Sequence, residues 1–394
     1  MVKKMNKIEK LIDELCPDGV GFKKLDKIAV VDKGKQLNKE LLFEDGKFPV
    51  LNGGINPSGY WNEYNFDENK IAISQGGASA GFVNFVTKKF WAGAHCYVVL
   101  PNEDIVINRY LYFYIKSKQE TIQNSKLGAG IPGLNKKEIE QLLIPIPPLN
   151  IQKEITKILD NFTTLEAELE AELEARRKQY TYYRDTLLDI KGEDYKTLGD
   201  IGIMIRGNGL QKKDFTETGV GCIHYGQIYT YYGTFADTTK TFVSSELAKK
   251  LKKAQKGDVL IAGVSENIED VCKPLGWLGD EICISGDMFA FRHNQNTKFI
   301  TYLLQTTNFH RYKERYAQGA KVTRVKTDKI LDYKIPIPSL SEQDHIVSIL
   351  DKFDALVNDI SIGLPAELNA RRKQYEYYRN QLLTFKPLEN QDVH

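Results

Sequence analysis

The sequence contains one segment twice, and this repeat limits the folds that the chain can adopt. Residues 144–162 match residues 335–353 at 11 of 19 positions, at an offset of 191. Residues 175–188 match residues 370–383 at 11 of 14 positions, at an offset of 195. Average residue usage would give only about two identities over both stretches. The fold must therefore accommodate two copies of the same element.

The repeated segment is predicted to form a long helix. Its apolar residues recur at intervals of three and four, which is typical of a helix that buries one face against a partner helix. About forty residues at 1.5 Å each would make a rod of roughly 60 Å. In the second copy we expect Gly363 and Pro365 to kink the rod, because proline removes a helical hydrogen bond. The apolar stripe comprises Ile151, Ile155, Ile158, Phe162, Leu165, Leu169, Leu173, Tyr180, Tyr183 and Leu187 in the first copy, and Ile346, Ile349, Phe353, Leu356, Ile360, Leu368, Tyr375, Tyr378 and Leu382 in the second.

The segments between the rods predict compact domains. Residues 20–143 and 195–335 are rich in glycine, asparagine and aromatic residues and contain short runs typical of strands. They are themselves distant copies, since Gly34 aligns with Gly207 at an offset of 173. We therefore expect an α+β fold with two mixed α/β domains and two long helices. The predicted boundaries are 1–143 for the first domain with an N-terminal helix over 5–15, 144–194 for the first helix, 195–335 for the second domain, and 336–394 for the second helix and the tail.

Composition excludes several classes of protein. A chain of 394 residues is long enough for two or three domains, and it has no run of about eighteen apolar residues that would span a membrane. The N-terminus lacks the apolar core of a signal peptide. The five cysteines are scattered without a Cys-x-x-Cys pair, so neither a disulfide framework nor a zinc site is expected. We expect a reduced, soluble, cytoplasmic protein with no membrane partner.

Charge separates the domains from the rods. Lysine and arginine exceed aspartate and glutamate by 20 to 17 in residues 1–143 and by 21 to 15 in residues 195–335. The rods are acidic, with 7 basic against 11 acidic residues in 144–194 and 6 against 9 in 336–394. The net charge of +2 therefore hides two domains that are basic relative to the rods, which favours a polyanionic partner for the domains.

The repeat also identifies a family. Two different globular segments, each followed by an Ile-Pro-Ile-Pro entry (144–147 and 335–338) and an Arg-Arg-Lys-Gln-Tyr-x-Tyr-Tyr-Arg block, resemble the specificity subunit of a type I restriction–modification system. The opening Ile8–Gly19 resembles the usual start of that family. The resemblance covers essentially the whole chain. It is specific, because the duplication and the helix motif occur together.

The resemblance implies a non-catalytic role in DNA recognition. Each globular domain would be a target recognition domain that reads one half of a split site in double-stranded DNA. The helices would pair as an antiparallel coiled coil, fix the spacer, and dock two methylation subunits and the restriction subunits. Adenine methylation and ATP-dependent cleavage would belong to those partners, with S-adenosylmethionine, ATP and Mg²⁺ bound there. No catalytic residue, cofactor or metal is expected on this chain.

Two other classes of function remain open from the residues alone. One is a fused methyltransferase or nuclease. The Gly-x-Gly-x-x-Gly of residues 128–133 follows a predicted helix rather than a strand, and Pro17-Asp18 lies fifty residues from Glu68-x-Lys70, so neither pattern predicts a catalytic site. The other class is a coiled-coil adaptor whose globular domains bind proteins and not DNA.

Candidate DNA contacts follow from the chemistry of base readout. Arginine and lysine recognise guanine and phosphates, asparagine and glutamine recognise adenine, and glycines let the backbone approach a groove. Two loops in each domain combine these residue types, although such loops are also ordinary turns. The candidates are Lys35, Asn52, Gly53, Asn56, Gln75, Gly76, Ser79 and Lys126 in the first domain, and Lys212, His224, Tyr225, Gln227, Ser265, Lys321 and Arg324 in the second.

The repeated basic block predicts a subunit interface. Arginine and tyrosine are enriched in protein interfaces, whereas a lone basic cluster would be only solvated helix charge. The candidate interface residues are Arg176, Arg177, Tyr180 and Tyr183 in the first rod, and Arg371, Arg372, Tyr375 and Tyr378 in the second.

Overall fold

The computed structural model describes residues 10, 12, 14–124, 133–192, 194–319, 321–359 and 361–388. The chain divides into two compact units. Unit 1 is Met1–Ala167 with Ala370–His394, and unit 2 is Glu168–Asn369. Each unit thus contains one globular domain, half of the first rod and part of the second. Most of the predicted N-terminal helix, Lys126 and nearly all of the 128–133 motif lie outside the described residues.

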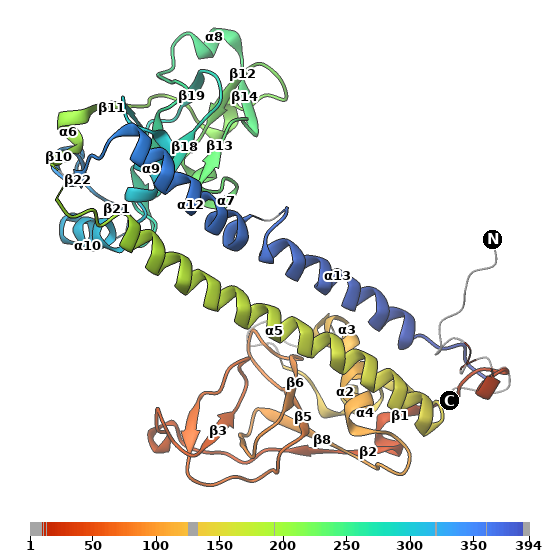
Figure 1. Ribbon diagram of the computed structural model, residues 1–394. Helices are drawn as coiled ribbons and strands as arrows, with labels where there is room; N and C mark the ends of the chain where they lie inside the picture. The colour runs from red at the N-terminus through yellow and green to blue at the C-terminus, as the bar shows by residue number, and fades with distance from the viewer. Residues whose placement is uncertain are drawn as a thin grey trace. The chain divides into compact units, whose positions relative to one another are not determined.

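The globular part of unit 1 is built from short strands and small helices (Figure 1). A four-stranded antiparallel sheet has the order β2-β8-β5-β6, a three-stranded sheet has the order β4-β3-β7, and β1 pairs with β9. The strands are β1 (Phe22–Lys24), β2 (Ala29–Lys33), β3 (Phe48–Leu51), β4 (Gly59–Trp61), β5 (Lys70–Ser74), β6 (Val83–Val86), β7 (Trp91–Ala92), β8 (Cys96–Pro101) and β9 (Leu143–Pro145). The helices are α2 (Asn108–Ser117), α3 (Gln119–Asn124) and α4 (Lys136–Glu140).

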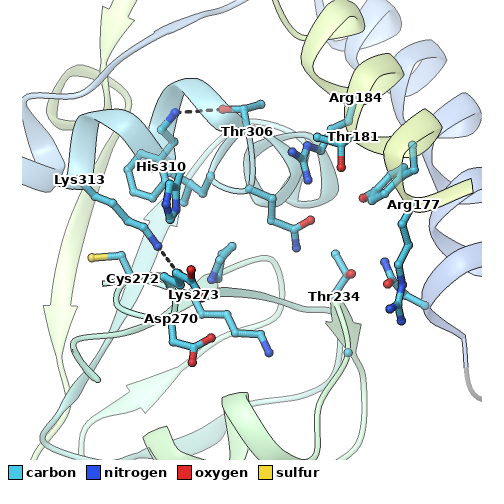
Figure 2. Close-up of a pocket in the computed structure, with 18 of the residues that line it drawn as sticks. Arg177, Thr181, Arg184, Thr234, Asp270, Cys272, Lys273, Thr306, His310 and Lys313 are labelled. Atoms are coloured by element: carbon cyan, nitrogen blue, oxygen red, sulfur yellow. Dashed lines mark hydrogen bonds between the residues drawn. The ribbon is translucent and has the colours of Figure 1, made fainter. Parts of the chain in front are cut away.

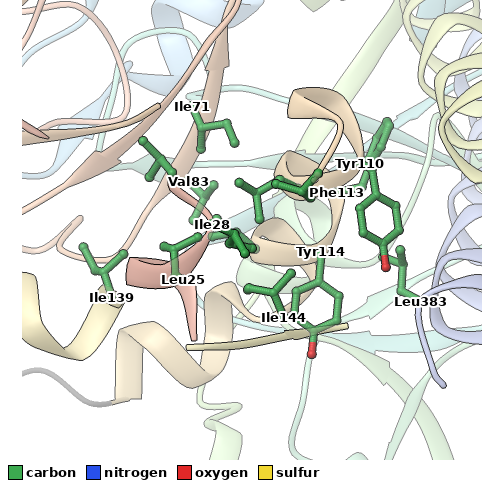
Figure 3. Close-up of a cluster of buried hydrophobic side chains, with 14 of the residues drawn as sticks. Leu25, Ile28, Ile71, Val83, Tyr110, Phe113, Tyr114, Ile139, Ile144 and Leu383 are labelled. Atoms are coloured by element: carbon green, nitrogen blue, oxygen red, sulfur yellow. The ribbon is translucent and has the colours of Figure 1, made fainter. Parts of the chain in front are cut away.

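The core of unit 1 joins its domain to both rods. Side chains from the sheets and from α2 pack together, among them Ile71, Val83 and Phe113, and Figure 3 shows Leu383 beside this cluster. Leu383 follows the second rod, so the C-terminal end of the chain completes the core of unit 1. A backbone hydrogen bond also joins the two ends of unit 1, because the N–H of Val20 donates to the carbonyl of Lys386 at 2.7 Å.

Unit 2 repeats this plan with larger sheets. A five-stranded sheet has the order β11-β20-β16-β18-β13, a four-stranded sheet has the order β14-β12-β19-β15, and β10-β22 and β17-β21 form pairs. The strands are β10 (Tyr195–Thr197), β11 (Gly202–Arg206), β12 (Val220–Ile223), β13 (Phe235–Ala236), β14 (Thr241–Val243), β15 (Lys253–Ala254), β16 (Val259–Ala262), β17 (Val264–Ser265), β18 (Pro274–Trp277), β19 (Ile282–Ile284), β20 (Met288–His293), β21 (Thr323–Arg324) and β22 (Lys334–Pro336). The helices are α6 (Leu198–Ile201), α7 (Tyr225–Thr230), α8 (Ser245–Ala248), α9 (Thr297–Leu303), α10 (Thr307–Tyr316) and α11 (Thr327–Leu331).

The first rod is a single helix, α5 (Leu149–Leu187), of 39 residues. In each unit it runs antiparallel to the second rod. In unit 1 the ring of Phe162 stacks on Tyr378 at 5.4 Å, and Arg372 donates to Glu166 at 2.6 Å. In unit 2 the ring of Tyr183 stacks on Phe353 at 5.3 Å. The predicted α+β class and the antiparallel helix pairing are therefore confirmed.

The second rod differs from the prediction of one kinked helix. It consists of two helices, α12 (Leu340–Asn358) and α13 (Leu364–Leu382), with an interruption at 359–363 (Figure 1). The Asp359 carboxylate accepts from the backbone N–H of Ser361 at 2.7 Å, which ends α12 in a side-chain turn. Pro365 lies in the first turn of α13, where its missing N–H costs no hydrogen bond. Proline therefore starts a new helix here and does not bend an existing one.

A buried glutamine attaches each domain to its own helix. Gln152 and Gln343 occupy equivalent positions in the repeat, and both are fully buried. The Oε1 of Gln152 accepts from the N–H of Ile107 at 2.8 Å, and its Nε2 donates to the carbonyl of Pro147 at 2.8 Å. The Oε1 of Gln343 accepts from Asn296 at 3.0 Å, and its Nε2 donates to Pro338 at 2.9 Å. The same amide thus bridges helix, domain and proline entry in both units.

Replacing Gln343 with Ala should destabilise unit 2 by about 1–3 kcal/mol, because the part-buried N–H of Asn296 and the buried carbonyl of Pro338 would lose their partner. Denaturant unfolding of the full chain would measure this change. Glu342→Ala is the matched control, since its side chain is exposed on the same turn, and a shift within about 0.5 kcal/mol is expected there. Equal effects of both substitutions would contradict the bridging role.

Unit 2 also contains a partly buried histidine that should make it sensitive to acid. Burial lowers the pKa of His293 from 6.5 to about 4, and its Nε2 is buried without a hydrogen-bond partner among the described residues. The unfolded chain therefore binds the proton more tightly than the folded chain. Stability contributed by His293 is present above pH 6.5 and is lost as the pH falls toward 4, by on the order of 2 kcal/mol. Unfolding at several pH values would show this decline, and His293→Gln should flatten it; an unchanged slope in that variant would contradict the assignment.

Candidate nucleic-acid interface

Two adjacent cavities in unit 2 collect the predicted DNA-contacting residues of the second domain. They have volumes of about 870 and 520 Å³ and share Val264 and Val322 in their linings, so we treat them as one groove, the unit 2 groove. Lys212, His224, Tyr225, Gln227 and Ser265 line the smaller cavity. Lys321 and Arg324 line the larger one. All seven candidates of this domain therefore lie on one concave surface, although they come from segments as much as a hundred residues apart.

The strand pair β17–β21 forms the floor between these two cavities. Val264 pairs with Arg324 and Ser265 with Thr323. This pairing brings the 264–267 loop, which follows the five-stranded sheet, to the segment that carries Lys321 and Arg324. The larger cavity is lined by four basic residues (Arg206, Lys321, Arg324 and Lys326) and two acidic ones (Asp287 and Asp328). Its excess of positive charge suits a phosphate backbone.

His224 is held as a neutral hydrogen-bond donor in the smaller cavity. Burial, with a smaller contribution from Lys212, lowers its pKa below the ordinary value. Its Nδ1 accepts from the backbone N–H of Gly226 at 3.2 Å, so the ring proton belongs on Nε2. The ring also lies 4.5 Å from that of Tyr225. An N–H donor beside an aromatic ring can contact an acceptor on a base edge or a phosphate oxygen.

In unit 1 the two predicted loops also meet, with a third loop between them. The Oδ1 of Asn52 accepts from the N–H of His95 at 3.0 Å, and Gln75 donates its backbone N–H to the carbonyl of His95 at 2.8 Å. A Cβ on Gly53 would lie 2.9 Å from the carbonyl oxygen of Gly76, so the close approach of these loops requires glycine. The 52–54 and 74–76 loops therefore form one surface.

Gln75 is the most informative polar group on that surface. Its side-chain Oε1 is buried and lacks a hydrogen-bond partner in the described part of the chain. Its backbone carbonyl accepts from Leu134, while Gly76 bridges to Gly133. This bridge matches β17–β21 in unit 2, so both domains place an equivalent loop pair at the candidate interface.

The other candidates of the first domain are less closely grouped. Lys35 and Asn56 are exposed, and the backbone N–H of Lys35 donates to Ala92 at 2.9 Å. Ser79 lies in the turn that follows Gly76 and accepts from the backbone N–H of Phe82 at 2.9 Å. Lys126 lies outside the described residues, so its position is not assigned.

The candidate subunit interface requires a correction. Tyr180 is only 5% exposed, and its hydroxyl donates to Asp354 at 3.3 Å inside unit 2. Tyr375 and Tyr378 pack on Phe162 in unit 1, as Tyr183 packs on Phe353 in unit 2. These tyrosines face the neighbouring helix because they belong to the apolar stripe. Tyr180 cannot serve as a contact for another subunit. Tyr375 and Tyr378 are partly covered by the helix pairing, whereas Tyr183 keeps 39% of its surface exposed.

Two further tyrosines of the rods are more exposed than any of the predicted four. Tyr182 is 65% exposed and Tyr377 is 57% exposed, at equivalent positions of the repeat. Sequence reasoning missed them, although their position one residue outside the stripe was a usable signal. The arginines have local partners as well, since Arg176 donates to Glu172 at 2.8 Å and Arg371 to Gln374 at 3.2 Å. Arg177 is exposed. Arg206 and Asn267 in the unit 2 groove are further candidates beyond those chosen from the sequence.

A third cavity of unit 2 lies beside α5 rather than at the groove. Its volume is about 530 Å³, and Figure 2 shows Arg177, Thr181 and Arg184 of α5 facing Thr306, His310 and Lys313 of the α10 region. The buried Lys313 donates to the carbonyls of Glu269 and Val271 at 2.6 and 2.7 Å, so it is a structural residue. No cluster of His, Cys, Asp or Glu that could hold a metal ion, and no helix able to cross a membrane, occurs in the parts of the chain that the structure describes.

Comparison with known proteins places this geometry in a family. The model of the type I restriction modification DNA specificity domain matches residues 17–175 and 191–370. The chain is 33% identical to a putative type I restriction enzyme specificity subunit of Haemophilus influenzae, in an alignment that covers 96% of this chain and 98% of that protein. It is 30% identical to the EcoR124I/EcoR124II specificity subunit of Escherichia coli, with 98% of each chain covered.

Solved structures support the fold. The type I restriction–modification S subunit from M. genitalium superposes with a TM-score of 0.60 at 20% identity, over 93% of this chain and 96% of that one. A chain from a structure of complex assembly in the type I restriction–modification system gives a TM-score of 0.58 at 14% identity, over 93% and 97%. Because the family model matches both halves of the chain and the relatives align over nearly its whole length, this chain belongs to the type I restriction–modification DNA specificity family.

Proposed function

We propose that each unit of this chain reads one half of a bipartite DNA site and that the paired helices set the distance between the halves. The observation that carries this proposal is the unit 2 groove, where amide, imidazole and guanidinium groups gather beside an excess of positive charge. Groups of this kind read base edges and phosphates. The basic charge of both globular domains relative to the rods supports the same conclusion.

The remaining parts of the complex follow from this role. Each rod offers one docking surface around its exposed tyrosine, Tyr182 on the first and Tyr377 on the second, which suits two methylation subunits, with restriction subunits joining the assembly. Methylation and ATP-dependent cleavage belong to those chains, where S-adenosylmethionine, ATP and Mg²⁺ bind. The present chain contributes no catalytic group and acts in the cytoplasm. A coiled-coil adaptor without DNA binding, the alternative that the sequence left open, gains no support from the relatives.

The groove can be tested by its salt dependence. Replacing Lys321 and Arg324 with Ala should weaken DNA binding by the assembled methylation complex. If the removed side chain had neutralised a phosphate, the slope of log affinity against log salt becomes shallower by about 0.9 for each such phosphate. If the removed side chain had read a base, the complex loses sequence preference at that one position. Fluorescence titration with specific and scrambled duplexes would separate these effects. The control replaces Lys249 and Lys256, exposed lysines that line neither cavity. Equal losses of affinity from the two pairs of substitutions would contradict the groove assignment.

A further inference from the structure

One of the charge differences between the two copies of the repeat lies beside a matched arginine. Arg184 on α5 and Arg379 on α13 are equivalent at an offset of 195. The next residue is Asp185 in the first copy and Asn380 in the second. A carboxylate that follows the arginine in unit 2 is therefore replaced by a neutral amide in unit 1. The two copies can be compared directly, because each arginine lies at the same place in its own unit.

In unit 2 the arginine is compensated. Arg184 donates through Nε and Nη2 to the Oδ1 of Asp185 at 3.0 and 2.9 Å, and its side chain is only 11% exposed. Asp185 also accepts from the backbone N–H of Thr307, the first residue of α10, at 3.2 Å. A charged pair buried in this way needs both partners, since removing one leaves the other charge unpaired in a poorly solvated place. Arg184 also lines the third cavity, as Figure 2 shows.

In unit 1 the same arginine lacks this partner. The Nε of Arg379 is buried and makes no hydrogen bond within the described residues, and Nη2 reaches only the Oδ1 of Asn380 at 3.5 Å. A second cation is near, because Arg379 helps to lower the pKa of Lys116, after the larger effect of burial. The Nζ of Lys116 donates to the carbonyl of Val83 at 2.8 Å and to Gln119 at 2.9 Å, both neutral acceptors. Unit 1 therefore holds two partly buried cations where unit 2 holds a closed ion pair.

We propose that Arg379 binds a carboxylate supplied by an acidic side chain of the protein that docks on α13. A guanidinium fork matches a carboxylate, and a partly desolvated cation gains more from such a partner than a solvated one. The partner's carboxylate would accept from the guanidinium group of Arg379, as Asp185 accepts from Arg184 in unit 2. The inference rests on the proposed docking of another subunit on the rods.

Position and charge favour a protein over DNA as the source of this anion. Arg379 lies seven residues, two helical turns, after Arg372, so both occupy one stripe of α13 with the candidate interface. On α5 the equivalent stripe of Arg177, Thr181 and Arg184 lines a cavity of about 530 Å³, large enough to admit a side chain. The rod that carries Arg379 has 6 basic against 9 acidic residues, which disfavours a phosphate backbone.

The repeat itself supplies the test. Asn380→Asp restores the carboxylate that unit 2 already has, so the arginine would be paired internally and the partner's side chain would be excluded. Titration of the full chain with the methylation subunit should show affinity weakened roughly 10-fold or more, in the range of a truncated buried charge pair. Asn380→Ala is the matched control and should stay within about twofold. The thermal midpoint of the Asn380→Asp chain alone should rise, which separates this result from a folding defect.

Three outcomes would overturn parts of the inference. Equal affinities for the Asp and Ala variants would mean that Arg379 binds no partner carboxylate. Unchanged subunit affinity with weaker DNA retention by the assembled Asn380→Asp complex would identify the anion as a phosphate and overturn the assignment to a protein. A separate pair of substitutions tests whether another subunit docks on the rods at all. Replacing Tyr182 and Tyr377 with Ala should weaken the complex if the rods are the docking surface, and no effect there would overturn the proposed docking regardless of Asn380.

Discussion

Exchanging residues 25–142 for the equivalent segment of the Haemophilus influenzae relative should change one half of the recognised DNA site and leave the other half intact. The structure explains why these limits suit the exchange. Strands β1 and β9 pair with each other at the two junctions, with Lys24 opposite Leu143, so the cut leaves that ladder in the host chain. The halves of α5 and α13 that belong to unit 1 also remain. The foreign domain would therefore be placed on the helices and the strand pair of the host chain.

The incoming segment must reproduce the contacts that attach the domain to α5. Gln152 binds the backbone of Ile105 and Ile107, which any sequence can provide, whereas the ion pair of Arg109 with Asp160 at 2.7 Å needs a basic residue at the start of α2. Unit 2 meets the same requirement with Lys298 and Asp351 at 2.6 Å. Mapping methylated adenines in cells that carry the exchanged chain would identify the new half-site. A reciprocal exchange of residues 198–333 is the control, and a change of both halves in either chimera would show that the units do not read independently.

The repeat made most of the architecture predictable. A pattern that occurs twice rarely arises by chance, so the apolar stripe and the proline entry predict a long helix beside a domain in each half of the chain. Gln152 and Gln343 illustrate the gain. Their identity was visible when the two copies were aligned, although only the structure shows that each amide bridges three segments. A residue that is identical in both copies can therefore be expected to have the same role in both units.

Two predictions were wrong in part, one for the tyrosines of the rods and one for Pro365, because each rested on a single property of the residue. The predicted stripe and the predicted subunit interface share the tyrosines at 180, 183, 375 and 378, and the buried Tyr180 cannot belong to both. Helical period alone would have placed Tyr182 and Tyr377 outward. The second rod is interrupted where a kink was expected, because Asp359 ends α12 before Pro365 is reached in the first turn of α13. The grooves depend on pairings such as β17–β21, between residues about sixty apart, and local patterns contain no information on them.

Deleting residues 166–169 should shorten the gap between the two half-sites and leave both half-sites unchanged. The sequence Leu165–Glu174 repeats Leu-Glu-Ala-Glu, and the division between the units falls inside the first copy, between Ala167 and Glu168. After the deletion Glu170 takes the place of Glu166 opposite Arg372 in unit 1, and Leu165 takes the place of Leu169 beside the core of unit 2. The contacts within each unit are therefore retained. Four residues shorten a helix by about 6 Å and rotate it by about 400°, which is within about 40° of a whole turn.

DNA can meet that change with one or two base pairs, because each base pair advances the duplex by about 3.4 Å. The second rod is four residues longer in the corresponding stretch (16 in 354–369 against 12 in 163–174), and this stretch contains the interruption between α12 and α13, so we expect the second rod to adjust there. Methylome mapping of the deletion should reveal a spacer shorter by one or two base pairs. The control replaces Glu168 and Glu170 with Gln at full length. That variant should keep the original gap, because it alters the charge of the stretch and not its length. An unaltered gap in a fully active deletion would mean that α5 is only a solvated connector, and that the distance between half-sites is set elsewhere in the complex.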